Sequence, residues 1–308
     1  MTLPSGWSAR RWLWVVQGLV TIGVVAFVGR SLARNWAQFR SVPVILSVGP
    51  AWLVGACLLV LLTFAIQVES WTRLLAGWGE RLAFRSALRT WTLANLGRYV
   101  PGKVWSVAGL VVLARQAGVQ AVPAAMSAFA VSAVSLGTGV AVVAGVAPES
   151  APPLRLAMAG VAALGTIGVL VWPPTARWLG RLADANTPLR PLAPSAALAS
   201  AALTVLAWVT YGAAFWMLAR GLVPTSALSL TTAIGAFTLA YILGWLALFA
   251  PGGVGVRELV LVGMLAPTLG TGGALAVSIA SRVLLTVLEA AAALVAFPLR
   301  HSPQESVR

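Results

Sequence analysis

The sequence predicts an all-α polytopic membrane protein built from two inverted-topology repeats. Of its 308 residues, 59% are hydrophobic and only 9% are charged, whereas soluble domains carry about 25% charged residues. Several apolar runs approach the ~20 residues that an α-helix needs to cross a ~30 Å hydrocarbon core. In addition, one pattern around a Pro-Gly pair occurs twice in the chain. The composition therefore excludes a water-soluble domain, and the duplicated pattern indicates a repeat.

The apolar runs predicted as spanning helices are almost free of charge, and they cover residues 12–28, 42–68, 123–147, 156–172, 195–219 and 273–297. The first run resembles a signal peptide, but no small-x-small cleavage site follows it, so we expect a retained span. With two further Pro-Gly hairpins, six to eight passes are expected. The whole chain, 1–308, is expected to be a single integral membrane domain, with 298–308 as a polar cytoplasmic tail.

The duplicated pattern reads Leu-x-x-aromatic-small-Pro-Gly-x-Val at residues 96–104 and 246–254. The same offset of 150 residues carries the second predicted span onto the fifth, and the third onto the sixth. We therefore predict a repeat A over 12–147 and a repeat B over 156–297. Each half makes three crossings plus a hairpin that returns to its own side, so the second half enters from the opposite side. Inverted repeats of this kind occur in transporters whose binding sites lie at broken helices.

The distribution of Arg and Lys predicts the orientation. With the N-terminus in the cytoplasm, fourteen cations fall on the cytoplasmic side and six on the other. This excess follows the positive-inside rule and places both termini in the cytoplasm of a cell-membrane protein. The net charge of +14 is therefore interpreted as a topology signal, and no nucleic-acid partner is expected.

The first Pro-Gly segment comes close to a nucleotide-binding loop, since Gly97 is followed by Gly102 and Lys103. Such a loop needs Ser or Thr after its Lys and a strand before it. Val104 stands at the hydroxyl position, and 81–96 has the pattern of a basic amphipathic helix. We therefore expect no nucleotide cofactor, and transport that is downhill or ion-coupled.

Catalytic and metal chemistry have few candidate residues. The chain has one cysteine, Cys57, inside an apolar run, and one histidine, His301, in the polar tail. A metal cluster or a Ser-His-Asp arrangement would need more of these side chains near one another. No metal, no cofactor and no catalytic residue is therefore expected, and the protein is not expected to be an enzyme.

The Pro-Gly pairs are interpreted as turns of two broken, re-entrant hairpins. Pro101 and Gly102 suit the start of a second half-helix near Lys103, whose free amides and dipole, with Arg98, would form an anion site. The second hairpin offers a helix N-terminus near 253–255, with Arg257 and Glu258 just beyond it. A surface loop whose cations touch lipid phosphates is the alternative.

Arg282 lies about ten residues into the last predicted span, where a central Arg costs about 2.5–3.5 kcal/mol on insertion scales. A compensating group is therefore expected. Glu289 is seven residues later, about 10 Å along the helix axis, and Glu258 lies in the facing hairpin. A buried Arg–Glu pair that fixes helix packing and a polar path through the membrane both stay open.

The segments "LGRYVPGKVWSVAG" and "APGGVGVRE" resemble the membrane-domain family at the N-terminus of bacterial lysylphosphatidylglycerol synthases, which also occurs alone. The resemblance runs from about residue 40 to 297. It implies lipid translocation between leaflets rather than aminoacyl transfer. The family's motif positions would be Arg98, Tyr99, Pro101, Gly102 and Lys103, then Pro251, Gly252, Gly253, Gly255, Arg257 and Glu258.

These patterns together predict a protein that translocates an anionic phospholipid or a lipid-linked envelope precursor between leaflets. Arg98 and Lys103 would receive the phosphate from the cytoplasmic side. Arg257 and Arg282 would serve the path or the far side, while Glu258 or Glu289 would balance charge or carry a proton. The alternative is a non-transporting membrane partner of an envelope-lipid synthase or glycosyltransferase, and an intramembrane lipid enzyme ranks last.

Overall fold

The structure, a computed structural model, describes residues 49–99, 104–146, 153–172, 191–225, 227–247 and 253–299. Within these ranges the chain is helical and contains no strand. The elements in order are α2 (Pro50–Gly77), α3 (Phe84–Asn95), η1 (Leu96–Tyr99), α4 (Val104–Gln116), α5 (Ala121–Gly145), α6 (Pro153–Val171), α8 (Pro194–Leu222), α9 (Leu230–Leu246) and α10 (Val256–Ala296). The predicted span 12–28 and the residues after 299 lie outside the described ranges.

Four of the described helices, α2, α5, α8 and α10, are long and apolar enough to cross a membrane. The shorter apolar helices are α9 and the Gly160–Val171 part of α6. The predicted all-helical class is therefore confirmed. The predicted spans 123–147 and 195–219 agree with α5 and α8 to within a few residues.

The second predicted span ends later than its composition suggested. The sequence predicts an end at residue 68, whereas α2 continues to Gly77. Arg73 pairs with Glu69 one turn earlier at 2.6 Å, and both charges are tolerated on an outer face of the helix. On the inner face Trp71, Leu74 and Leu75 are fully buried, so packing continues the helix through its polar end.

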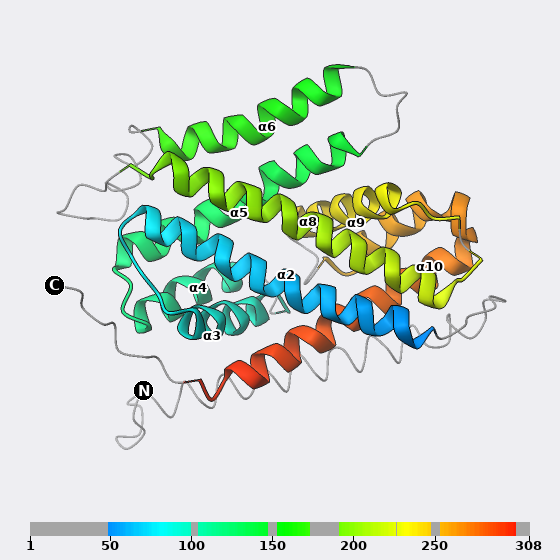
Figure 1. Cartoon of the computed structure of the whole chain (residues 1–308), viewed down its shortest axis with the longest axis horizontal. Helices are drawn as coiled ribbons and strands as arrows, with labels where there is room; N and C mark the ends of the chain where they lie inside the picture. The colour runs from blue at the N-terminus through cyan, green and yellow to red at the C-terminus, as the bar shows by residue number, and fades with distance from the viewer. Residues whose placement is uncertain are drawn as a thin grey trace, which may run out of the picture.

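Helices α2 and α8 pack side by side along most of their length (Figure 1). Hydrogen bonds between hydroxyl groups join the two helices. The Thr63 hydroxyl donates to the Thr210 hydroxyl at 2.8 Å, and the Ser70 and Ser200 hydroxyl oxygens lie 2.8 Å apart. At one end the backbones meet, with the Gly49 amide donating to the Gly221 carbonyl at 3.0 Å. Small and hydroxyl-bearing residues are the usual means of close helix packing in membranes, where apolar side chains gain little by leaving lipid.

The remaining helices flank this central pair (Figure 1): α3 and α4 lie at one end, and α9 with the first part of α10 lies at the other. Helix α6 packs on α5 at the edge of the molecule. Helices α2 and α8 contribute to the hydrophobic clusters at both ends. The centre of the molecule is therefore a junction between two groups of helices.

The two helices of the first hairpin are too short to cross a bilayer. Helix α3 has 12 residues and α4 has 13, which at 1.5 Å per residue gives about 18–20 Å against a core of ~30 Å. Helix α4 begins at Val104, next to the predicted start near Lys103. The turn itself, residues 100–103, lies outside the described ranges, so the re-entrant path stays a prediction.

Helix α10 consists of two segments that meet at Gly270, where φ is 69°. The second segment, 271–296, matches the last predicted span, 273–297. Shifted by 150 residues, α4 and α5 fall on 254–266 and 271–295, which overlap the two segments of α10, 256–269 and 271–296. The order of elements is thus the same in both halves at this offset, and the inverted repeat stays a prediction.

Candidate functional site

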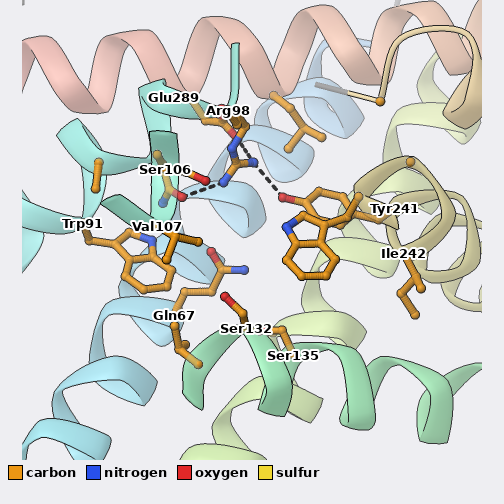
Figure 2. A pocket seen from close by; sticks show the side chains of 18 of the residues that line it. Gln67, Trp91, Arg98, Ser106, Val107, Ser132, Ser135, Tyr241, Ile242 and Glu289 are labelled. Atoms are coloured by element: carbon orange, nitrogen blue, oxygen red, sulfur yellow. Dashed lines mark hydrogen bonds and ion pairs between the residues drawn. The ribbon is translucent and has the colours of Figure 1, made fainter. Parts of the chain in front are cut away.

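A cavity of about 160 Å³ lies at the junction between the two groups of helices (Figure 2). Side chains from α2, α3, η1, α4, α5, α8, α9 and α10 line it. At about 15 Å³ for each water-sized site, this volume holds on the order of ten water molecules. That is also room for a lipid headgroup.

Arg98 projects into this cavity from η1 and contacts both halves of the chain (Figure 2). One terminal nitrogen donates to Glu289 Oε1 at 2.9 Å and to the Tyr241 hydroxyl at 2.6 Å, and the other donates to Asn95 Oδ1 at 2.8 Å. Its partner Glu289 is buried on α10, with a side chain 8% exposed. The ion pair therefore joins the first hairpin to the last helix inside the protein.

Tyr99 completes the contact with Glu289. Its hydroxyl donates to Glu289 Oε2 at 2.7 Å and lies 3.2 Å from Thr286 Oγ1. Both oxygens of the carboxylate are thus bonded, one by each of two consecutive residues of η1. Gly97 makes this turn possible, because a Cβ there would come within 2.7 Å of the Trp105 and Ser106 backbone.

Arg257, in the first turn of α10, is held by aromatic rings. Its guanidinium carbon lies 4.9 Å from the centre of the Tyr241 ring and 5.5 Å from that of Phe237. Among the described residues, no carboxylate lies within ion-pair distance of Arg257. Cation–π contacts satisfy the face of a guanidinium and leave its N–H edge for an anion. Gly244 leaves room for the Arg257 side chain, which a Cβ there would strike.

The start of α10 depends on two glycines with positive φ, Gly253 at 70° and Gly255 at 86°. Glu258 caps this helix, since its Oε2 accepts from the Gly255 amide at 2.7 Å. Its other oxygen pairs with Arg282 Nε. One carboxylate thus fixes the helix start and balances a cation on the second segment of the same helix.

Arg282 lies near the middle of the segment 271–296, and its side chain is only 13% exposed. Of the two carboxylates that the sequence offered as partners, the structure pairs it with Glu258, while Glu289 pairs with Arg98. Arg282 also lines the cavity. The packing role and the pathway role are therefore compatible in one residue.

Among the described residues, the charges around the cavity leave one cation in excess. Three guanidinium groups, those of Arg98, Arg257 and Arg282, face two carboxylates, those of Glu258 and Glu289. Arginine binds phosphate and carboxylate oxygens through paired N–H groups. The arrangement is therefore suited to an anionic group. Within the described ranges, no group of three His, Cys, Asp or Glu side chains comes together to hold a metal.

Opposite Arg98, the cavity wall is polar but uncharged. Gln67, Ser132 and Ser135 lie there (Figure 2), and Trp91 lies beside them. The Gln67 side chain makes no hydrogen bond with the described residues. These side chains are not among those predicted from the sequence. Gln67 could have been recognised as a candidate, because it is a polar residue within an otherwise apolar run.

The predicted site residues separate into three groups. Arg98, Tyr99, Gly253, Arg257, Arg282 and Glu289 line the cavity together. Gly255 and Glu258 support it from the start of α10. Pro101, Gly102, Lys103, Pro251 and Gly252 lie outside the described residues. Tyr241, which contacts both Arg98 and Arg257, was missed because its role depends on tertiary packing.

Comparison with known proteins gives one finding that covers most of the chain. A family model described as the lysylphosphatidylglycerol synthase TM region matches residues 14–293. The search of curated proteins found no match.

Proposed function

Because the chain belongs to the lysylphosphatidylglycerol synthase transmembrane-region family and is a multi-pass membrane protein, we propose that it moves an anionic phospholipid or a lipid-linked envelope precursor between leaflets. The observation that carries this proposal is the cavity with an excess positive charge among apolar helices. The lipid phosphate would enter the cavity while the acyl chains stay in the surrounding hydrocarbon.

Charged groups inside a membrane protein are costly and usually serve transport or binding. A structural role explains Arg98 and Arg282, each of which has a carboxylate partner. It does not explain Arg257, whose contacts with Tyr241 and Phe237 fix its position without neutralising it. An incoming phosphate would supply the missing negative charge, so Arg257 is the proposed acceptor.

The position of the cavity between the two groups of helices supports transport rather than static binding. In transporters with inverted repeats, the site lies where the repeats meet, and rocking of one repeat opens it to alternate sides. Arg98 pairs with Glu289 and Tyr241 across this junction. In the proposed cycle these contacts break and form again as the two halves move.

The proposed orientation places both termini in the cytoplasm of the cell membrane. It rests on the excess of Arg and Lys in the segments assigned to that side. In this orientation the first hairpin faces the cytoplasm. A reporter fused to the C-terminus checks it, since a fluorescent protein is expected to fold there and a periplasmic phosphatase is expected to stay inactive.

Reconstitution tests the proposed transport. Purified protein in liposomes, with a trace of acyl-labelled phosphatidylglycerol, is expected to expose the inner-leaflet label to an impermeant quencher faster than protein-free liposomes do. Replacing Arg257 by Gln removes a charged hydrogen-bonding partner worth about 1.5–3 kcal/mol. The exchange rate should therefore fall about 10-fold to 100-fold.

A matched control is available in Arg220, whose guanidinium carbon lies 5.3 Å from the centre of the Trp216 ring. This residue makes the same kind of contact as Arg257 but does not line the cavity. Arg220→Gln should leave the exchange rate within about twofold of wild type, since only a peripheral cation–π contact is lost. Exchange that equals the protein-free rate, for every anionic lipid tried, would contradict transport and favour a non-transporting partner of a lipid synthase.

A further inference from the structure

The proposed repeat relates the two walls of the cavity to each other. Many lining residues have a counterpart 150 positions later that also lines the cavity; this holds for Trp91 with Tyr241, Ala94 with Gly244, Asn95 with Trp245, Val107 with Arg257, Ser132 with Arg282, Ser135 with Leu285 and Leu136 with Thr286. The cavity is therefore bounded by equivalent surfaces of the two halves.

These equivalent surfaces differ in charge. The second half carries Arg257 and Arg282 where the first half carries Val107 and Ser132. The only lining cation of the first half among the described residues is Arg98, and it is bonded to Glu289 of the second half. At these equivalent positions the second half carries cations where the first half is uncharged, and both carboxylates that pair with the site's arginines, Glu258 and Glu289, also belong to the second half. We call the surface around Arg257 the Arg257 wall, and the uncharged surface of Gln67, Ser132, Ser135 and Trp91 the neutral wall.

The neutral wall has unused hydrogen-bonding capacity. The Gln67 amide and the Ser135 hydroxyl make no hydrogen bond with the described residues. The Trp91 indole N–H is buried and likewise lacks a partner there. Ser132 donates its hydrogen to the Ala128 carbonyl at 2.9 Å, which leaves its oxygen lone pairs free to accept. The Gln67 amide and the two serine hydroxyls offer both donors and acceptors to a bound molecule.

Such a wall fits hydroxyl groups better than an ammonium group. A hydroxyl group both donates and accepts hydrogen bonds, as do the Gln67 amide and the serine hydroxyls opposite Arg98. The Trp91 ring beside them can pack on the carbon face of a polyol. An ammonium group would need a carboxylate. Glu289 is engaged by Arg98 and Tyr99, and Glu258 by Arg282 and the Gly255 amide.

On the basis of the proposed transport function, we propose that the cargo is a phospholipid with a hydroxylated headgroup, a polyol or sugar phosphate. The phosphate binds on the Arg257 wall, and the hydroxyls bind on the wall formed by Gln67, Ser132, Ser135 and Trp91. The juxtaposition of Arg257, which has no carboxylate partner among the described residues, with the uncharged polar wall across the same cavity carries this inference.

Headgroup selectivity in proteoliposomes tests this inference. The probes are acyl-labelled phosphatidic acid, phosphatidylserine, phosphatidylglycerol and phosphatidylinositol with identical acyl chains, each as a trace in phosphatidylcholine. A site built to bond hydroxyls rejects analogues that lack them. Phosphatidylglycerol and phosphatidylinositol are therefore expected to exchange about tenfold faster than phosphatidic acid and phosphatidylserine.

The double variant Gln67→Leu with Ser135→Ala should remove this preference by slowing the two hydroxylated lipids to the rate of phosphatidic acid. The rate for phosphatidic acid itself should not change, because the Arg257 wall is intact. Thr166→Val is the matched control, since its hydroxyl bonds to the Ala162 carbonyl of its own helix at 2.6 Å, outside the cavity. Thermal unfolding in detergent checks that each variant is folded.

The outcomes separate this inference from the proposed function. Equal exchange of all four lipids by the wild type would overturn the hydroxylated cargo and leave anionic lipid transport standing. If no lipid exchanges, the transport function fails, and native mass spectrometry of the purified protein with the same lipids decides the inference. Preferential retention of phosphatidylglycerol and phosphatidylinositol, lost in the double variant, would support the headgroup site, and equal retention would overturn it.

Discussion

The two Pro-Gly regions share a sequence pattern but use their charges differently. Next to the first, Arg98 reaches across the molecule to Glu289, a residue 191 positions away. Next to the second, Glu258 pairs with Arg282 and caps the helix to which both belong. The sequence pattern is thus duplicated, whereas the charge pairs differ between the two regions. Arg98 of the first region depends on a carboxylate of the second half, whereas Arg282 is paired within its own half and Arg257 has no carboxylate partner among the described residues.

The largest expected effect comes from breaking the contact between the halves. Glu289→Gln leaves Arg98 without its charge partner in a largely buried place, and removal of one member of a buried pair costs about 3–5 kcal/mol. Thermal or denaturant unfolding in detergent measures the loss. The double variant with Arg98→Met and Glu289→Met should recover much of this stability, because no isolated charge is left. A Glu289→Gln protein as stable as wild type would show that the halves do not depend on this pair.

A substitution at Gly253 tests the backbone conformation of the second Pro-Gly region and its close approach to α9. Its φ of 70° suits glycine, and a Cβ there would meet the Gly244 backbone at 2.9 Å. Gly253→Ala should therefore lower the free energy of unfolding by about 2–3 kcal/mol. Gly263→Ala, inside the following helix α10 with no atom within 4 Å of the added Cβ, should be neutral or stabilising by up to ~1 kcal/mol. Equal effects of the two changes would argue against the close approach of α9 to the hairpin.

A change at Tyr241 distinguishes the role of Arg98 from that of Arg257, because the Tyr241 hydroxyl accepts a hydrogen bond from Arg98 while its ring contacts the Arg257 guanidinium. Tyr241→Phe removes only the first contact, at a cost of about 1–2 kcal/mol, since Arg98 keeps its other partners. Exchange of phosphatidylglycerol should fall less than with Arg257→Gln. A larger fall would mean that Arg98, rather than Arg257, limits passage of the phosphate.

The smallest effect is expected for an ion pair outside the site. Glu69 and Arg73 pair on the surface of α2 with side chains 36% and 56% exposed. Glu69→Gln should change stability by less than about 0.5 kcal/mol, because exposed helix pairs contribute little. This variant sets the scale for the others. A loss comparable to that of Glu289→Gln would contradict the distinction between surface and interior pairs.

Most of the helical architecture could be predicted because membrane insertion depends on composition. The limits of α5 and α8 follow from the lengths of the apolar runs. The end of α2 could not be placed in this way, since the pairing of Glu69 with Arg73 and the burial of Trp71 continue the helix. Local energetics therefore determine boundaries that hydropathy alone misplaces.

The site could be predicted in part. Arg98, Arg257 and Arg282 were visible as cations in or beside apolar runs, and Glu258 and Glu289 as their possible partners. Which carboxylate meets which cation depends on tertiary packing, so the Arg98–Glu289 pair could not be derived from spacing along a helix. The neutral wall of Gln67, Ser132 and Ser135 was overlooked for a different reason, because single polar residues in apolar runs often serve only packing.

The proposed transport depends on a cavity with excess positive charge inside the membrane domain. The most direct test uses Ser135→Cys in a Cys57→Ala background, in membranes, with small anionic and cationic thiol reagents whose rates are normalised to a free thiol. The anionic reagent is expected to react faster, and Arg257→Gln is expected to abolish the preference. Val161→Cys on α6, at a position 72% exposed on the outer surface, should show no such preference. If the thiol introduced by Ser135→Cys does not react, or reacts faster with the cationic reagent, then no accessible cavity with excess positive charge exists there.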